Sequence, residues 1–477
     1  MYKNNILLYY TNPSMKRHNG LNFMKGGDSV YETTTNGQKW KLLLVIVSPI
    51  LVTQIALYLV TFFDVLFSSK YGTTDLAGVS IGSSIWMPIY VGISGILLSV
   101  TPIVAQSVGA KKMKEATFTV QQGIIVSIIL ALIVFAFMFF SMNTILSWMP
   151  LEPHVQDVAH GYLLAMCFGL VPLFIYTVLR CFIDALGQTR MSMFITLIST
   201  PVNIFFCYLF IFGNWGFPAL GGVGAGIASA ITYWIICFIA IGITIKAKPF
   251  SNFQLFKQFS KPNWKKSKEI LLIGVPIGLA LFAETGIFAV VTIVMSQYST
   301  EVIGAHQIAM NFASLSYMIP LSISMGATIL IGYEIGAGRA KDARDYTKKA
   351  ILLAVSICMV TLAILIGFRH EIAMIYSDDV DVLSLAASFL IYAAFFQLSD
   401  AIQAPIQGAL RGYKDVTITS IMAVISYWVI ALPFGYVLAT FFDLGPYGYW
   451  IGLITGLAIG AISLSIRLRI VQNKFHS

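Results

Sequence analysis

Twelve long apolar runs follow one another along this chain, and only short polar segments separate them. Each is about 20 residues or longer, the length that an α-helix needs to cross the hydrocarbon core of a bilayer. Charged residues make up 11% of the chain, against roughly a quarter in a soluble domain. The sequence therefore predicts an all-α membrane protein with twelve transmembrane helices and no soluble domain. The runs lie at about residues 42–66, 79–106, 120–141, 158–180, 190–212, 223–245, 269–297, 303–335, 349–368, 382–408, 417–440 and 447–466.

The basic residues support this number of helices. If the N-terminus is placed in the cytoplasm and the loops alternate, all but Lys70 and Arg369 of the 30 lysines and arginines fall on the inner side. The positive-inside rule then predicts a multi-pass protein of the cell membrane with both termini in the cytoplasm. The net charge of +9 reflects this orientation. Because the basic residues are dispersed over separate loops, we expect no binding to nucleic acid.

The two halves of the chain repeat each other. One constant offset in the sequence carries Pro49 onto Pro276 and Lys114 onto Lys341, and no gap is needed up to Ala116. Each half holds six of the twelve runs, an even number, so both halves begin on the same side of the membrane. An axis along the membrane normal must then relate them. We predict two pseudo-symmetric six-helix lobes.

This repeat divides the chain into four segments. Residues 1–37 are polar without periodicity, and we expect a disordered cytoplasmic tail. Residues 38–245 form the predicted N-lobe with helices 1–6, and residues 269–477 form the C-lobe with helices 7–12 and a short cytoplasmic tail. Between them, residues 246–268 carry seven lysines and predict a basic, amphipathic cytoplasmic linker on the anionic inner leaflet.

Glu284 is the residue on which we expect function to depend most. It lies near the middle of an apolar run that contains no lysine or arginine. A carboxyl group at that depth costs about 2.5–3.5 kcal/mol on insertion scales, so a chain retains one mainly where it faces a cavity and binds something. We interpret Glu284 as half of a cation-binding centre.

A second deep carboxyl group, Asp400, lies eleven residues before Arg411. That spacing is about 16 Å along a helix, which places it near the membrane midplane. Its helix face also carries three amides, Gln397, Gln403 and Gln407. Four polar groups on one face of an apolar helix favour a water-filled cavity, and the alternative is a polar seam between packed helices.

A third acidic residue, Asp64, lies six residues before Lys70 in the first span, about 9 Å from its outer end. We interpret it as a proton- or cation-binding group in an outer cavity. The alternative is a carboxylate that reaches the outer headgroup region. The same helix carries a polar stripe, Gln54, Tyr58 and Thr61.

Two further spans carry polar stripes. The span at 190–212 holds Asn203 on a face shared with threonines and Cys207, and the span at 303–335 holds Gln307 and Asn311. His306 lies near the outer end of that span, where a capping or interfacial role is favoured over proton transfer. The five cysteines form no CxxC pair and are expected to be buried apolar residues.

The deep charges, Asp64, Glu284 and Asp400, face no deep lysine or arginine in this interpretation, so the interior is expected to be purely acidic. In a low dielectric, an unpaired carboxylate binds a proton or another cation. Competition between two cations for one carboxylate is enough for exchange across the membrane. An organic cation and H⁺ or Na⁺ displace each other there while the two lobes rock to alternate access. Abundant deep aromatic and methionine residues suit a pocket for flat apolar cations.

This layout resembles the multidrug and toxic compound extrusion (MATE) family, NorM-like branch. The resemblance rests on the first helix with Pro49, Gln54 and Asp64, on the Glu284 helix leading to residues 304–308, and on residues 400–412. It covers nearly the whole chain after about residue 38. It implies two six-helix bundles around a V-shaped cavity, and cation-driven efflux of organic cations by alternating access.

The resemblance also implies sites. The C-lobe cation site would map to Glu284 and Asp400 with Tyr317 nearby, and the N-lobe site to Asp64 and Asn203. Two departures are Cys207, where family members often have Asp or Asn, and Phe396, where some NorM-like members have Tyr. NorM-like members with the Glu and Asp pair are commonly Na⁺-coupled, so Na⁺ is favoured over H⁺. We expect a monomer that confers antibiotic resistance, with no cofactor besides the coupling ion.

Other functions fit the sequence less well. A lipid-linked oligosaccharide flippase of the same superfamily is the main alternative, but its pyrophosphate would call for deep arginine or lysine. An enzyme is disfavoured, because the chain has no HExxH, GxSxG or Walker A motif and only six histidines. A passive channel fits poorly with a duplicated, two-lobed layout.

Overall fold

The computed structural model describes residues 33–149, 151–375 and 380–475, and these are almost entirely helical. The predicted N-terminal tail lies outside the described residues except for its last five. Of these, Thr35 caps the first helix: its side chain accepts a hydrogen bond from the Gln38 backbone, and the Gln38 side chain accepts one from the Thr35 backbone. This reciprocal capping box fixes the start of the helix at Asn36.

The N-terminal half contains eight long helical segments, and the short 3₁₀ turn η2 (Asn214–Gly216) precedes the last of them. The helices are α2 (Asn36–Tyr71), α3 (Thr73–Leu97), α4 (Val100–Gly109), α5 (Met113–Ser147), α6 (Pro153–Phe168), α7 (Leu170–Ala185), α8 (Thr189–Phe212) and α9 (Gly222–Lys246).

The C-terminal half follows the same plan. Its segments are α10 (Trp264–Met295), α11 (Thr300–Gly336), α12 (Ala340–Gly367), α13 (Arg369–Met374), α14 (Val380–Gly412), α15 (Thr417–Val424), the π-helical η4 (Ile425–Ala431), α16 (Leu432–Phe441) and α17 (Pro446–Lys474).

Twelve membrane spans account for these segments. Eleven helices of the described residues are long and apolar enough to cross a membrane, and the pair α6 and α7, bent by 49°, makes a twelfth. The bend falls at Gly169, where a Cβ would lie 3.1 Å from the Cα of Ala230 on α9. Glycine therefore permits the close approach of the bent span to α9. The predicted number of transmembrane helices is confirmed.

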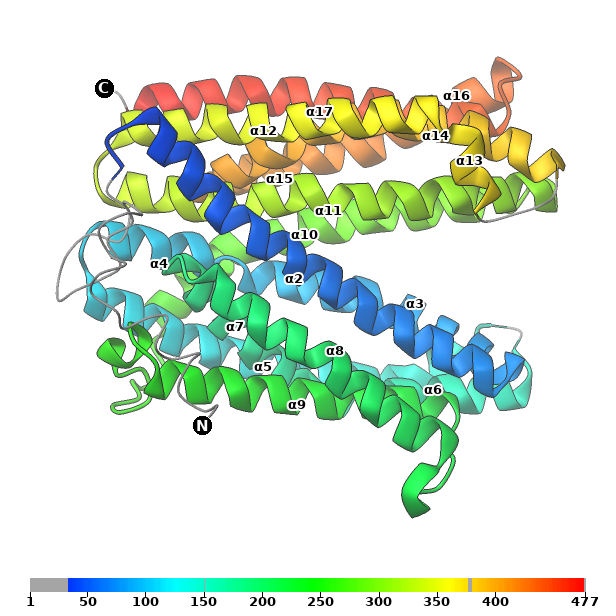
Figure 1. The fold of residues 1–477 in the computed structure, drawn as a ribbon, viewed down its shortest axis with the longest axis horizontal. Coiled ribbons are helices and arrows are strands. Elements are labelled where there is room, and N and C mark those ends of the chain that lie inside the picture. Colours follow the sequence, from blue (N-terminus) through cyan, green and yellow to red (C-terminus); the bar gives the residue numbers. More distant parts are fainter. Residues whose placement is uncertain (1–32, 150, 376–379, 476–477) are drawn as a thin grey trace, which may run out of the picture.

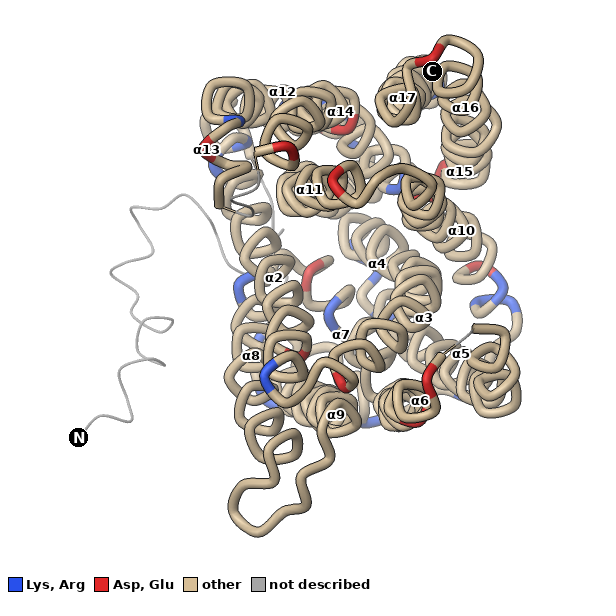
Figure 2. Tube along the Cα trace, turned by 90° about the vertical axis from the view of Figure 1, so that its right-hand side faces the viewer, with Lys and Arg blue, Asp and Glu red and all other residues tan. Residues whose placement is uncertain are grey.

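The two halves form two lobes that meet at one end of the molecule. In Figure 1 the C-terminal half occupies the upper part and the N-terminal half the lower part, and the ribbons diverge away from the end that holds the C-terminus. Figure 2, seen along the helices, shows the same division. Contacts between the lobes run from α3 to α10 and from α2 and α4 to α11.

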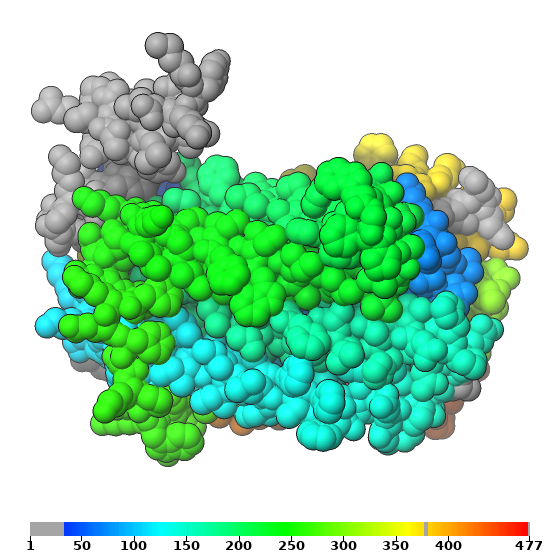
Figure 3. Space-filling view, turned by 90° about the horizontal axis from the view of Figure 1, so that it is seen from below, coloured from blue at the N-terminus to red at the C-terminus, as the bar shows by residue number. Residues whose placement is uncertain are grey.

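The outer face of the N-terminal half is apolar. Figure 3 shows this face, which is covered by α5, α6, α8 and α9. Large aromatic side chains are exposed on these helices, as expected for a surface that meets lipid. They include Phe139, Phe140, Phe205, Trp234 and Phe238.

The linker between the lobes differs from the predicted amphipathic segment. Its first residue, Lys246, still belongs to α9, and its last five residues, 264–268, belong to α10; between them it forms a short 3₁₀ turn, η3 (Phe250–Phe253), and otherwise irregular chain. Gln121 on α5 donates hydrogen bonds to the carbonyl oxygens of Leu255 and Gln258 at 2.7 and 2.8 Å. These amide contacts and the buried aromatic rings of η3 hold the linker against the N-lobe.

Candidate functional site

The C-lobe brings Glu284, Tyr317 and Asp400 together from three helices, α10, α11 and α14. Glu284 and Asp400 are 7% and 4% exposed. Tyr317 interacts with the Glu284 carboxyl group, and Asp400 interacts electrostatically with both. Residues far apart in the sequence therefore form one buried acidic centre, and they are the three that the family resemblance implies for the C-lobe site.

The expectation of a purely acidic interior is wrong. Arg411, near the end of α14, is buried and interacts electrostatically with Glu284 and Tyr317. Arg180 on α7 interacts in the same way with Asp184, one turn further along. Both arginines lie near helix ends, where backbone position alone suggests a loop. Their long side chains extend from there into the lobes, which span positions do not reveal.

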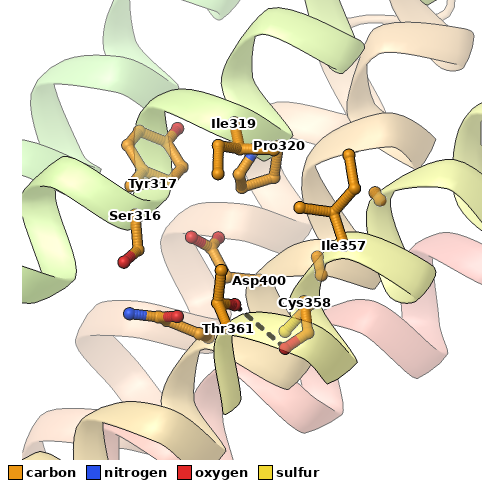
Figure 4. A pocket seen from close by; sticks show the side chains of 11 residues that line it. Ser316, Tyr317, Ile319, Pro320, Ile357, Cys358, Thr361 and Asp400 are labelled. Carbon is orange, nitrogen blue, oxygen red and sulfur yellow. Dashed lines mark hydrogen bonds between the residues drawn. The ribbon is translucent and has the colours of Figure 1, made fainter. Parts of the chain in front are cut away.

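A small cavity adjoins Asp400 between α11, α12 and α14. Its volume is about 10 Å³, which is close to the minimum for one water molecule. Figure 4 shows Asp400 between Tyr317 on one side and Cys358 and Thr361 on the other. The Gln397 side chain also lines the cavity, and its buried Nε2 has no hydrogen-bond partner in the described part of the chain.

The polar groups from α12 escaped sequence reasoning. Cys358 and Thr361 are three residues apart and share a helix face, but no acidic residue in that span drew attention to them. Tyr427 escaped as well: it is buried in η4 and interacts electrostatically with Glu284, Asp400 and Tyr317. π-helical turns occur frequently at functional sites, but a sequence gives no dependable signal for one.

The remaining amides of α14 occupy a different environment. Gln403 donates a hydrogen bond to the Tyr427 hydroxyl at 2.9 Å, and Gly460 of α17 lies directly against its amide oxygen. Gln407 is buried as well. Gln403 thus lies in a seam between helices, the alternative arrangement for this stripe, while Gln397 and Asp400 line the cavity.

The N-lobe holds a separate acidic centre at Asp64. Asn203 Nδ2 and Cys207 Sγ, both on α8, donate to Asp64 Oδ1 at 3.1 and 3.2 Å. Ser229 Oγ on α9 donates to Asp64 Oδ2 at 2.8 Å. Asp64 is buried, so the alternative of a carboxylate in the outer headgroup region does not hold. The structure joins Asp64 and Asn203 as the sequence predicts, and it adds Ser229 and Cys207 as donors.

The polar residues predicted for a substrate cavity on α2 and α11 are mostly accessible. Tyr58, Thr61, Gln307 and Asn311 are exposed, and Gln54 is half-buried. The helices that carry them contact each other across the lobes. Their role in substrate binding stays a prediction.

His306 differs from its predicted capping or interfacial role. It is fully buried in the C-lobe, with its ring centroid 5.6 Å from that of Trp450, and Thr292 Oγ1 lies 3.3 Å from its Nε2. The reason is that α17 covers this face of α11 near its start. The position of His306 near the end of its span therefore did not indicate whether its side chain is exposed.

These lobes and sites define a duplicated membrane protein with a buried acidic centre in each half, and comparison with known proteins places it in a family. The MatE family model matches twice, at residues 49–209 and at residues 276–437. The two matches begin at Pro49 and Pro276, the pair of prolines that the internal repeat aligns. The chain belongs to the MatE family and is a membrane transporter, not an enzyme.

Relatives extend over almost the whole chain. A probable multidrug resistance protein NorM of Halalkalibacterium halodurans is 53% identical over 443 residues, which cover 93% of this chain and 97% of the relative. The protein of that name in Bacillus subtilis is 52% identical over 444 residues, covering 93% and 98%.

Solved structures share the fold. An outward-facing multidrug resistance MATE family transporter aligns with a TM-score of 0.84 at 18% identity, covering 93% of this chain and all of that one. The eukaryotic MATE transporter AtDTX14 aligns with a TM-score of 0.82 at 19% identity, covering 92% and 99%. At this identity the likeness concerns the arrangement of the helices.

Proposed function

We propose that this chain is a secondary active multidrug efflux transporter of the cell membrane, with both termini in the cytoplasm. It exchanges organic cations for Na⁺ or H⁺ by alternating access of its two lobes. The names of its relatives support drug-like substrates, and the accessible polar and aromatic residues of α2 and α11 suit a cavity that accepts them.

One observation carries the proposal: the buried assembly of Glu284, Asp400 and Tyr317 beside a cavity in the C-lobe. Burial in a membrane penalises two neighbouring carboxylates unless a cation joins them. The cavity has room for about one water molecule or one small ion, and its lining combines apolar side chains with the carboxyl group of Asp400, the amide of Gln397 and three hydroxyl-bearing residues. Hard cations prefer such oxygen ligands.

Arg411 sharpens the proposed stoichiometry. Two ionised carboxyl groups and one guanidinium group leave a single net negative charge in the C-lobe centre. One monovalent cation neutralises that charge, whereas a second would leave an uncompensated positive charge in a low dielectric. We therefore expect one Na⁺ or one H⁺ to bind this centre in each transport cycle, with Na⁺ favoured.

A lipid-linked oligosaccharide flippase is the second candidate, because Arg411 is buried in the C-lobe and Arg180 is half-buried in the N-lobe. Pyrophosphate recognition requires positive charge that is free to pair with the substrate. Arg180 and Arg411 instead interact with Asp184 and Glu284 of their own lobes. This internal pairing favours the cation exchanger.

Everted membrane vesicles test the proposal. Movement of a fluorescent organic cation would be followed while Na⁺ or H⁺ gradients, high inside the vesicle lumen, are imposed separately. The proposal predicts that one of the two gradients drives the cation into the lumen. If neither gradient moves any organic cation, the efflux function is rejected and the flippase becomes the better hypothesis.

A further inference from the structure

Two clusters of ion pairs cross between the lobes at the end that holds the C-terminus. In the first, Lys39 Nζ at the start of α2 lies 2.7 Å from Asp342 Oδ1 and 2.7 Å from Asp345 Oδ2, both on α12 of the other lobe. In the second, Lys266 Nζ at the start of α10 lies 3.5 Å from Glu115 Oε1 on α5 of the other lobe. Each cluster therefore contains an ion pair that joins the two lobes.

The internal repeat relates these clusters to each other. The offset that aligns Pro49 with Pro276 also carries Lys39 onto Lys266 and Glu115 onto Asp342. Each lobe thus supplies a lysine from its first helix to an acidic residue at the start of the third span of the other. Such reciprocal contacts are what a two-fold axis generates at a self-complementary interface.

The backbone between the clusters repeats the same reciprocity. A Cβ added to Gly109 would collide with the Tyr333 carbonyl oxygen, and one added to Gly336 would collide with the Gln106 carbonyl oxygen. The repeat aligns the two glycines with each other, and it aligns their two partners as well. The α4 and α11 backbones are therefore in direct contact here, and Gln106 Nε2 also donates to the Gly412 carbonyl oxygen at 2.8 Å.

We propose that Lys39 with Asp342 and Asp345, and Lys266 with Glu115, form a symmetric ionic latch that controls transport. The latch holds the lobes closed at this end, and its two halves break together when the lobes part here. The inference rests on the proposed function only in that alternating access requires this end to open.

The two halves of the latch differ in strength. The two carboxylates that the structure gives to Lys39 both belong to the other lobe, and its side chain is 8% exposed. Lys266 has a second partner in its own lobe, Glu269, at 2.8 Å, and it keeps this partner when the lobes part. Its partner across the lobes, Glu115, is exposed, and exposed ion pairs contribute little. Of the free energy that the two ion-pair clusters add against opening, the larger part therefore comes from Lys39.

Pulsed electron paramagnetic resonance can measure the latch directly. Spin labels at Lys114→Cys and Lys341→Cys would report the distance between the lobes, since both lysines are exposed and occupy equivalent positions. The native cysteines are buried, so labelling is directed to the two introduced ones. The full-length protein in lipid nanodiscs would be compared with Lys39→Gln, with Lys266→Gln and with the control Lys265→Gln, which removes an exposed charge next to the latch.

The latch predicts that Lys39→Gln raises the ratio of long to short distances about tenfold, which corresponds to about 1.4 kcal/mol. Lys266→Gln should raise this ratio only about two- to threefold, because its ion pair across the lobes involves an exposed carboxylate and contributes less. Lys265→Gln should leave the ratio unchanged. The charge swap Lys39→Asp with Asp342→Lys should restore the short distance, which a merely misfolded variant would not do.

An unchanged distance distribution in Lys39→Gln overturns the latch, and so does an equal shift in Lys265→Gln. These results are separable from those on transport. If Lys39→Gln shifts the distance between the lobes as predicted but the protein moves no organic cation, the latch stands and the proposed function is rejected. If the protein transports organic cations but Lys39→Gln does not change the distance between the lobes, the proposed function stands and the latch is rejected.

Discussion

The acidic centres of the two lobes differ in how the protein surrounds them. Asp64 in the N-lobe accepts hydrogen bonds from three neutral donors, Asn203, Cys207 and Ser229. The C-lobe centre instead places two carboxyl groups near each other, with a tyrosine, an arginine and a cavity. We therefore expect Asp64, whose oxygens already accept hydrogen bonds, to need a further ligand less than the two interacting carboxyl groups of the C-lobe.

This contrast shows that duplication preserved the scaffold and not the chemistry. The alignment of the two halves places Glu284 on Leu57, and Asp64 on Val291. The lobes share helix order, a proline inside the first helix (Pro49 in α2 and Pro276 in α10), and the reciprocal ion pairs between the lobes. Each acidic centre arose within one lobe only, so each can be altered without a counterpart that compensates for it.

The largest expected effect comes from Asp400→Asn. This change removes one of the two carboxylates that we propose bind the cation, and we expect ion-driven transport to fall by about 100-fold or more, as for other groups that act as a unit. Initial rates of organic cation movement in vesicles measure the effect. Asp443→Asn in the exposed turn after α16 makes the same chemical change and should transport normally. Equal rates for Asp400→Asn and wild type would remove the distinction between the two lobes.

Arg411→Gln should destabilise the C-lobe. The change removes the buried guanidinium charge that interacts with Glu284, and leaving a buried charged group without such compensation costs about 1–3 kcal/mol. Thermal unfolding of the purified protein in detergent would measure this loss. Added Na⁺ should recover part of the stability if a cation can replace the guanidinium charge, and Arg411→Lys should lose less. A variant as stable as wild type would show that Arg411 does not balance this centre.

A smaller effect is expected in the N-lobe from Cys207→Ala. The change removes one donor to Asp64, and the net loss of a hydrogen bond to a buried acceptor is about 1 kcal/mol. Cys237→Ala removes the same atoms from another buried site and serves as the control. Denaturant unfolding should find Cys207→Ala the less stable variant. If the two variants are equal, the Cys207 thiol does not support Asp64.

Much of the architecture follows from local sequence properties. Apolar length predicts the twelve spans, and the repeat from Pro49 onward predicts the lobes. Depth within a span singles out Asp64, Glu284 and Asp400, because burying a carboxyl group is costly wherever it occurs.

What the sequence did not reveal depends on tertiary packing. The side chain of Arg411 turns inward from a helix end, and Ser229 meets Asp64 only because α9 packs beside α8. His306 is covered by α17, which lies far away in the sequence. The linker is held by hydrogen bonds from the side-chain amides of Gln121 and Gln122 on α5, and nothing in the sequence around these glutamines indicates that contact. Each of these contacts joins distant segments, and helical periodicity describes only one segment at a time.

The central claim is that the C-lobe centre couples ion movement to organic cation transport, while Asp64 does not carry that coupling. The most direct measurement compares Glu284→Gln with Asp64→Asn in everted vesicles under an imposed Na⁺ gradient, with expression of both proteins matched. We predict that Glu284→Gln abolishes Na⁺-driven transport and that Asp64→Asn retains most of it. Transport that survives in Glu284→Gln and is lost in Asp64→Asn would contradict the claim and assign the coupling to the N-lobe.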